Sequence, residues 1–113
     1  MRLKAAIFVS ALTRRLFAEG GMAAIEKRGA EEAGAILIRI RHRDGSESLA
    51  APAPQTAFDT DHPDERLFEF RKMRVAETEV SELIARETRF DPDIWVVEIE
   101  TDSPETYLSF TED

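Results

Sequence analysis

The residues best suited to chemistry lie in a short acidic stretch at positions 59–65, with the sequence Asp-Thr-Asp-His-Pro-Asp-Glu. Carboxylate oxygens bind hard cations such as Mg²⁺ and Ca²⁺, and a histidine nitrogen extends the choice to Mn²⁺ or Zn²⁺. The spacing matches neither an EF-hand loop nor the two-histidine helix of a zincin. We therefore favour a solvated acidic loop. The alternative is a metal site whose ligands are Asp59, Asp61, His62 and Asp64.

A second candidate is a row of arginines within residues 35–43, where isoleucine and arginine alternate. A period of two is typical of a half-buried strand, so the arginines share one face. Guanidinium groups fit phosphate and carboxylate, which makes the row a candidate anion-binding surface. The alternative, which we favour, is a cross-strand ladder of ion pairs with Glu98 and Glu100. The residues of the row are Arg39, Arg41 and Arg43.

The dipeptide Asp44-Gly45 predicts that this strand ends in a hairpin. A two-residue type I′ turn needs positive φ at both central positions, and an Asp-Gly pair tolerates it. Because the partners opposite the arginines are then small, the guanidinium groups would stay accessible. The predicted cross-strand pairs are Arg43 with Ser46, Arg41 with Ser48, and Arg39 with Ala50.

Residues for nucleophilic catalysis are few. The chain has no cysteine and only two histidines, and no serine lies in a glycine-framed nucleophile elbow. In the predicted hairpin His42 falls opposite Glu47, where we expect a hydrogen bond at the rim of the core rather than catalysis. The sequence therefore assigns no catalytic residue.

Hydrophobic periodicity predicts the elements that must position these residues. Apolar side chains recur at helical spacing in residues 4–18 and 77–89 and at strand spacing in residues 94–101. This order favours the α+β class, with a single antiparallel or mixed sheet of about five strands and two helices packed on one face. The other predicted strands are residues 22–28, 35–43, a returning strand that ends at Pro52, and 66–73, with 102–113 as an edge strand or a loose tail.

Composition limits the possible classes of protein. The 113 residues suffice for one domain with a modest core, and the net charge is −8. Residues 1–43 carry nine Lys or Arg against four Asp or Glu, whereas residues 44–113 carry six against nineteen, so we expect the halves to pack and pair their charges. The lack of cysteine excludes a disulfide scaffold and fits the cytoplasm. No stretch approaches the roughly 20 apolar residues of a membrane span.

Several short segments together resemble a known family. The segments are Ser10-Ala11-Leu12 with Arg14-Arg15, Arg28-Gly29, Ala33-Gly34-Ala35, Asp44-Gly45, Pro52-Ala53-Pro54, Ala85-Arg86-Glu87, and residues 89–98. The chain is similar in these to an uncharacterised family of short bacterial proteins, catalogued as a domain of unknown function. The resemblance implies a bacterial cytoplasmic protein of one domain. It implies no activity, cofactor or catalytic residue.

Two functions from different classes are compatible with these residues. The preferred one is a non-catalytic binding or protein-interaction module, or a self-associating protein, that uses an uncovered face or edge of the sheet. Phe90 and Trp95 are its candidate anchors if they are exposed. The alternative is a small metal-dependent enzyme, similar to a phosphoesterase, that uses the acidic stretch at 59–65. The net negative charge and the lack of aromatic residues among the arginines argue against a nucleic-acid partner.

Overall fold

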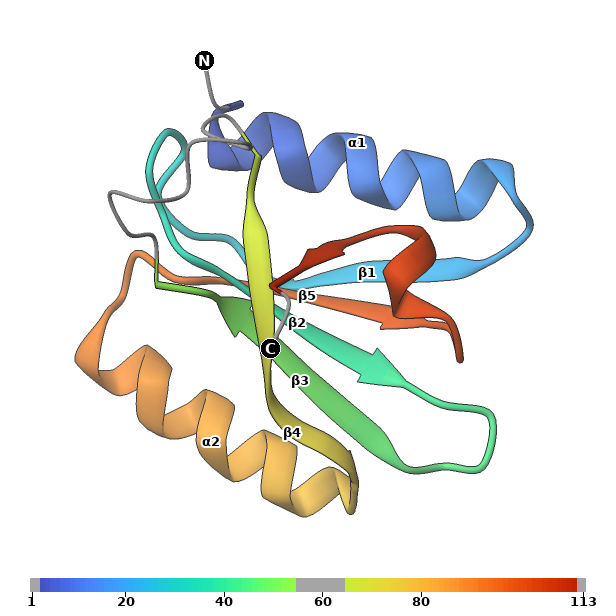
Figure 1. Cartoon of the computed structure of the whole chain (residues 1–113). Coiled ribbons are helices and arrows are strands. Elements are labelled where there is room, and N and C mark those ends of the chain that lie inside the picture. The colour runs from blue at the N-terminus through green and yellow to red at the C-terminus, as the bar shows by residue number, and fades with distance from the viewer. Residues whose placement is uncertain (1–2, 55–64, 112–113) are drawn as a thin grey trace.

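The elements of the fold follow the predicted order along the chain. The computed structural model describes residues 3–54 and 65–111, and Figure 1 shows their arrangement. Both predicted helices form, and the 102–113 segment contributes a short edge strand. The elements are α1 (Ala5–Ala18), β1 (Met22–Lys27), β2 (Ile36–Arg41), β3 (Glu47–Pro52), β4 (Leu67–Val75), α2 (Glu77–Phe90), β5 (Trp95–Glu100), the 3-10 helix η1 (Pro104–Thr106) and β6 (Ser109–Phe110).

The strands form one mixed sheet with the order β1-β5-β2-β3-β4-β6. Three of the neighbouring pairs, β1 with β5, β2 with β3 and β3 with β4, are antiparallel. The other two, β5 with β2 and β4 with β6, are parallel. The chain runs through β2, β3 and β4 as a meander, and α2 then carries it back to insert β5 between β1 and β2. This confirms the α+β class and a mixed sheet.

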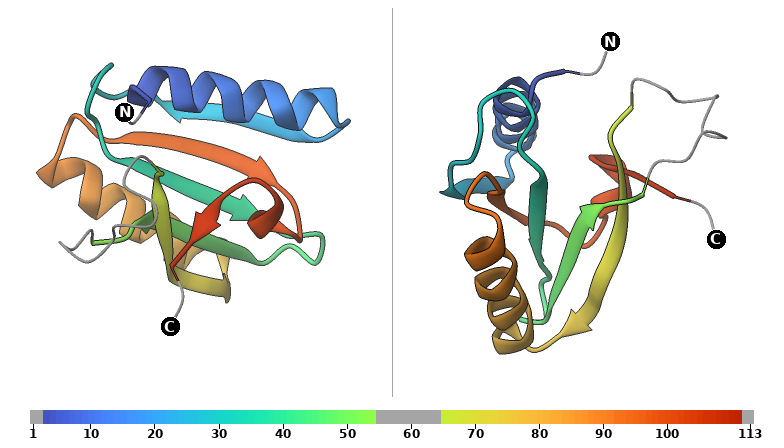
Figure 2. Two further views of the ribbon diagram at one scale, coloured as in Figure 1. Left: turned by 45° about the horizontal axis from the view of Figure 1, so that its top comes forward. Right: turned by 90° about the vertical axis from the view of Figure 1, so that its left-hand side faces the viewer.

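The two helices lie on opposite faces of the sheet, whereas we expected them on one face. Alternate residues of β2 explain the difference, since Ile36 and Ile38 belong to the core beneath α1 and Leu37 belongs to the core beneath α2. The sheet is therefore apolar on both sides where Leu37 of β2 pairs with Val96 of β5. In Figure 2, α1 runs beside β1 and β5 while α2 runs beside β3 and β4. Each helix buries its own apolar stripe against a different part of the sheet.

The larger core lies under α1. The stripe predicted for this helix is buried, and Phe8 at its margin packs on Phe68 of β4 with ring centroids 6.0 Å apart. Leu108 and the residues around η1 and β6 close the same face of the sheet. The buried members of the helical stripe are Ala5, Val9, Leu12 and Leu16.

Trp95 organises the end of the sheet next to the loop between β1 and β2. It is 1% exposed, and its indole Nε1 donates a hydrogen bond of 2.7 Å to the carbonyl of Ala30. The loop passes so close that a Cβ on Gly34 would lie 2.9 Å from Trp95 Cδ1 and would clash with the carbonyl of Asp93. Only glycine fits there, because any side chain would separate the loop from β5.

The two α-helices of the described ranges are α1 and α2, and each has 14 residues. Neither α1 nor α2 has both the length and the apolar character that a membrane-crossing helix requires.

Candidate functional site

The β2–β3 hairpin closes through a three-residue loop rather than the predicted two-residue turn. The Gly45 N–H donates to the carbonyl of His42 at 3.0 Å, and Gly45 has φ of 91°. Asp44 does not have the positive φ that a type I′ turn needs, since Arg74 is the one non-glycine residue of the described ranges with positive φ. The loop is thus a turn followed by a left-handed glycine, a common three-residue hairpin.

The extra loop residue shifts the cross-strand pairing by one position. Arg41 lies opposite Glu47 and Arg39 lies opposite Leu49, instead of Ser48 and Ala50. A shift of one residue exchanges the two faces of a strand, because side chains alternate with a period of two. The small residues that we expected beside the arginines therefore lie on the other face, and a glutamate takes their place.

Glu47 is the centre of a buried ion-pair network. Its side chain is 2% exposed. One carboxylate oxygen accepts a hydrogen bond from Arg39 Nη1 at 2.7 Å, and the other lies 3.2 Å from Arg41 Nε. A single carboxylate therefore holds two arginines of the row, one on each oxygen.

Arg39 connects this carboxylate to two other elements. Its Nε lies 3.0 Å from the carboxylate of Glu26 on β1, and its Nη1 donates to Ser81 Oγ on α2 at 3.1 Å. Burial lowers the pKa of Arg39, but the hydrogen bond with Glu47 and the charges of Glu26 and Glu47 outweigh this effect, so the pKa lies above its ordinary value. Arg39 therefore stays charged, since a guanidinium is not deprotonated in proteins.

The other two arginines of the row, Arg41 and Arg43, have different surroundings. Arg41 is half exposed and lies 3.5 Å from Glu98, as the ladder interpretation predicted. Arg43 belongs to the hairpin loop and is exposed. Glutamates outnumber arginines around the two inner positions, and the structure therefore offers no support for an anion there. Anion binding by the three arginines stays a prediction.

His42 lies in an arrangement that resembles a catalytic triad. Its Nε2 is 2.7 Å from Ser48 Oγ, and its Nδ1 is 3.2 Å from Asp102 Oδ1. Ser48, however, is 2% exposed, and its Oγ also accepts a hydrogen bond from the Arg74 N–H at 3.0 Å. A nucleophile must reach substrate, and this hydroxyl is enclosed. The hydrogen bonds of His42 and Ser48 therefore join the hairpin to β4 and to the end of β5. They also stabilise Arg74 at its positive φ of 47°.

Asp102 should make the stability of this junction depend on pH. The backbone N–H of Arg43 donates to it, His42 and Arg74 add favourable interactions, and together they hold its pKa below the ordinary value. A carboxyl whose pKa is lowered by folding stabilises the protein above its unfolded pKa of about 3.9 and loses that contribution as the pH falls through the folded pKa. Asp102→Asn should therefore lower the free energy of unfolding at neutral pH and much less in acid.

Urea unfolding at about pH 7 and about pH 2.5 measures this difference. Asp93→Asn is the matched control, because it removes an exposed carboxylate whose side chain makes no hydrogen bond or ion pair within the described ranges. An equal loss of stability for Asp102→Asn at the two pH values would contradict the assignment.

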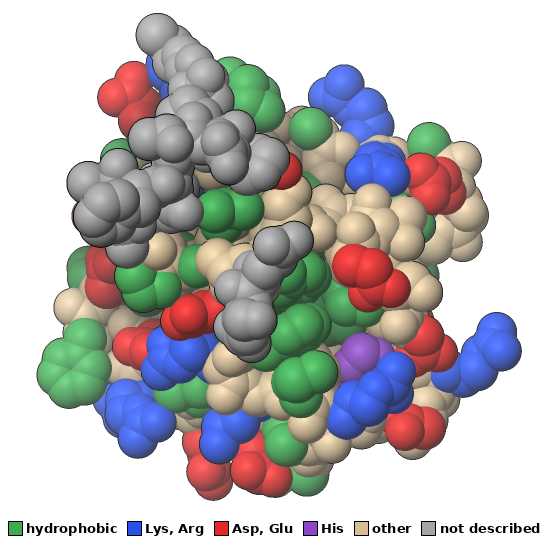
Figure 3. Space-filling model, viewed as in Figure 1, with side chains coloured by type: hydrophobic (Ala, Val, Ile, Leu, Met, Phe, Trp, Pro, Cys, Tyr) green, Lys and Arg blue, Asp and Glu red, His purple; other side chains and the backbone are tan. Residues whose placement is uncertain are grey.

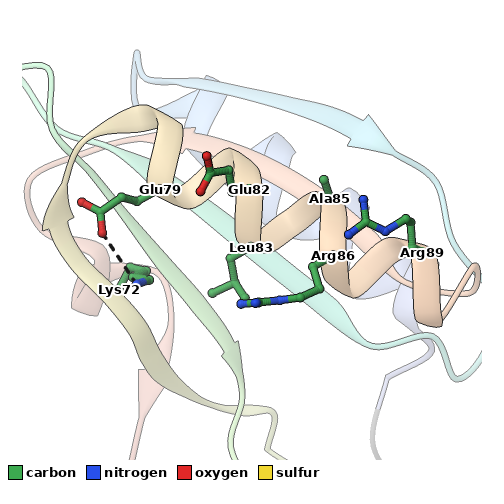
Figure 4. Close-up of a pocket in the computed structure, with 7 residues that line it drawn as sticks. All are labelled: Lys72, Glu79, Glu82, Leu83, Ala85, Arg86 and Arg89. Carbon is green, nitrogen blue, oxygen red and sulfur yellow. Dashed lines mark ion pairs between the residues drawn. The ribbon is translucent and has the colours of Figure 1, made fainter.

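A second region of interest is a groove of about 370 Å³ that runs along α2 and includes Lys72 of β4 (Figure 4). At one end Lys72 of β4 pairs with Glu79 at 3.7 Å. At the other end Arg86 and Arg89 form no ion pair with any residue that the structure describes. Glu82 lies one helical turn before Arg86, and this spacing would allow an ion pair between them. The lining residues are Lys72, Glu79, Glu82, Leu83, Ala85, Arg86 and Arg89.

The two aromatic anchors suggested by the sequence have opposite environments. Phe90, the last residue of α2, is 81% exposed, while Trp95 is 1% exposed. Trp95 is therefore not available to a partner in this fold, because it fills the core under the loop between β1 and β2. The alternating apolar residues of β5 are compatible with a buried Trp95. No local sequence pattern indicates whether Phe90 is exposed or packs against the core at the end of α2.

The proposed metal ligands Asp59, Asp61, His62 and Asp64 lie outside the residues that the structure describes. Within residues 3–54 and 65–111, no cluster of His, Asp and Glu is arranged to hold a metal ion. The metal site and the enzyme that would use it remain predictions from the sequence.

Titration calorimetry tests the metal site directly. If the stretch binds a cation, Mg²⁺, Mn²⁺ or Zn²⁺ should give saturable heat at millimolar concentration or below, and the double change His62→Ala with Asp64→Ala should abolish it. Glu82→Ala with Glu105→Ala, two exposed carboxylates elsewhere, is the control for general loss of negative charge. Absence of heat from all three metals would contradict the site.

The fold and these contacts can be compared with known proteins. Residues 3–109 match the model of a family described as a protein of unknown function, DUF1491. The chain belongs to the DUF1491 family. The resemblance seen in the sequence is thereby confirmed. Among curated proteins, no sequence matches this chain.

Solved structures of related proteins share the fold over their full length. The solution structure of a structural-genomics target from A. tumefaciens has 54% sequence identity and a TM-score of 0.86, and the match covers 100% of this chain and 98% of that one. A crystal structure of a DUF1491 protein from Caulobacter crescentus has 29% identity and a TM-score of 0.79, with 98% and 100% covered. An NMR structure of a DUF1491 protein from the same species has 30% identity and a TM-score of 0.79, with 99% of each chain covered. Membership of the DUF1491 family thus agrees with the fold and links the chain to bacterial relatives. The description of the family names no activity.

Proposed function

We propose that this DUF1491 protein is a non-catalytic interaction module that binds a partner protein through the C-terminal half of α2, with Phe90 as the anchor. The observation that carries the proposal is the 81% exposure of this phenylalanine. Burying a whole phenylalanine side chain in a partner is worth about 1.5–3 kcal/mol. The lack of cysteine fits a reducing compartment, so we place the interaction in the cytoplasm.

The arginines beside Phe90 support this surface. Arg86 lies one helical turn before Phe90, so the two side chains are neighbours on the helix. Neither Arg86 nor Arg89 has an ion-pair partner among residues 3–54 and 65–111. Arginine and aromatic residues are enriched among the residues that dominate binding energy at interfaces. The expected partner surface is therefore an apolar pocket with carboxylates around its rim.

The charged side chains along the rest of α2 and on β4 are arranged differently from those at the C-terminal end of the helix. Figure 3 shows basic and acidic side chains interspersed over α2 and β4 along the lower border of the view. There, the Lys72–Glu79 and Arg71–Glu87 pairs satisfy charges within the protein. At the C-terminal end of α2, two guanidinium groups that form no ion pair within residues 3–54 and 65–111 lie beside Phe90, which is 81% exposed. This combination makes the end of the helix the preferred contact.

Site-specific photo-crosslinking in the producing cell tests the proposal. A benzophenone amino acid at position 90 should give a discrete adduct, and the double change Arg86→Ser with Arg89→Ser should abolish it. The same probe at Met73, an apolar residue of β4 that is 64% exposed, is the control and should give no such adduct.

Two results would contradict this interface. One is an identical adduct at positions 73 and 90, which would indicate contact without specificity. The other is an adduct at position 90 that persists in the arginine variant, because the rim charges would then contribute nothing. Phe90→Ser should change the free energy of unfolding by no more than about 0.5 kcal/mol, so misfolding would not explain a loss of binding.

A further inference from the structure

The strand β1 forms one edge of the sheet as it is described for residues 3–54 and 65–111. This strand pairs with β5 on one side, and it is the first strand in the sheet order, so no other described strand pairs with it. An edge strand of this kind exposes backbone N–H and C=O groups that can form hydrogen bonds with another strand. Figure 2 shows β1 beside α1, at the opposite side of the sheet from β4.

The charged residues that usually protect such an edge are turned into the protein. Lys27 donates to the carbonyl of Pro92 at 2.6 Å and to that of Ile94 at 2.9 Å. Glu26 pairs with Arg39 at 3.0 Å. Charged side chains on an edge normally prevent pairing with another chain, and here both are engaged internally. The rest of β1 is Met-Ala-Ala-Ile, in which Met22 is 53% exposed and Ile25 is 38% exposed.

The sheet face beside this edge is acidic. Ala24 lies opposite Glu98, and Met22 lies opposite Glu100. Neighbouring strands are about 4.8 Å apart, so a long side chain on a strand added outside β1 could extend over the small Ala24 and reach Glu98. With Glu26, three carboxylates line this face. Arg39 pairs with Glu26 and the half-exposed Arg41 pairs with Glu98, whereas Glu100 has no ion pair within residues 3–54 and 65–111. The face therefore selects positive side chains.

We propose that β1 accepts an extended, basic segment of another protein as a seventh strand of the sheet. Backbone hydrogen bonds to β1 supply the affinity, and Lys or Arg residues at alternate positions contact the carboxylates. A second copy of this chain is disfavoured, since antiparallel pairing of two β1 strands would bring the same carboxylates of both copies together. This surface uses none of the residues proposed above for the α2 interface, so each proposal can be tested independently of the other.

A synthetic peptide with the sequence Val-Lys-Val-Lys-Val-Lys-Val, blocked at both ends, tests the proposal by NMR titration of the ¹⁵N-labelled protein. The expected result is saturable shifts of the amides of β1 and β5. The same peptide with alternate amides N-methylated keeps its charge but cannot form the backbone hydrogen bonds. It should bind more weakly by roughly tenfold or more. A peptide with Glu in place of Lys should not bind.

Matched variants of the protein complete the test. Ala24→Lys places a positive charge on the edge and should weaken binding by roughly tenfold, whereas Ala85→Lys on the exposed side of α2 should leave it unchanged. Glu98→Gln with Glu100→Gln should also weaken it, and a dispersed spectrum verifies that each variant is folded. Equal binding of the N-methylated peptide, shifts confined to other strands, or a dimer in sedimentation that Ala24→Lys dissociates would each overturn the proposal.

Discussion

Glu47→Ala should lower the free energy of unfolding by about 3–5 kcal/mol, because removal of one partner of a buried ion pair leaves the other charge uncompensated. Glu47 is 2% exposed and holds Arg39 and Arg41 on its two carboxylate oxygens. Without it, Arg39 keeps an ion pair with Glu26 at 3.0 Å and a longer one with the half-exposed Glu77 at 3.8 Å. Urea unfolding at neutral pH measures the loss. Glu82→Ala, on the exposed side of α2, is the control and should stay within about 0.5 kcal/mol.

The double change Arg39→Met with Glu47→Leu separates charge from packing. If the cost of Glu47→Ala comes from an orphaned guanidinium, removal of both charges should recover most of the stability, since apolar pairs of similar volume often equal or exceed a buried ion pair. A double variant as unstable as the sum of the two single variants would show that Glu47 acts through packing alone.

Trp95→Ala should cost about 3–5 kcal/mol, as expected for the loss of a large aromatic side chain from a core. Trp95 belongs to the core under α1, donates a hydrogen bond to Ala30, and lies under the guanidinium of Arg28 at 5.1 Å. Circular dichroism during urea unfolding measures the change, because the variant has lost the single tryptophan of the chain.

Phe90→Ala provides the comparison for this second prediction. Both residues are aromatic and lie only a few positions apart, but Phe90 is 81% exposed. Its removal should change the free energy of unfolding by at most about 0.5 kcal/mol. Similar losses for the two variants would contradict the assignment of Trp95 to the core and of Phe90 to a contact surface.

The sequence by itself determined which segments become helices and strands. The predicted helix at 77–89 is α2 (Glu77–Phe90), and the predicted strand at 94–101 is β5 (Trp95–Glu100). These predictions succeed because hydrophobic periodicity reflects which side of a segment is buried, and that requirement acts on each segment locally. The ion pair between Arg41 and Glu98 was also predictable, since charged residues alternate in both strands.

Only the tertiary structure decided which residues meet. One additional residue in the hairpin loop moved Glu47 onto the arginine face, because a shift of one position exchanges the two faces of a strand. The contact between His42 and Asp102 joins residues 60 positions apart and has no local signature. The placement of α1 and α2 on opposite faces depends on Leu37, whose burial requires a helix that folds from residues 40 positions further along the chain. Local patterns specify burial, whereas register and partners are selected by the total energy of the packed chain, and for this reason they could not be read from the sequence.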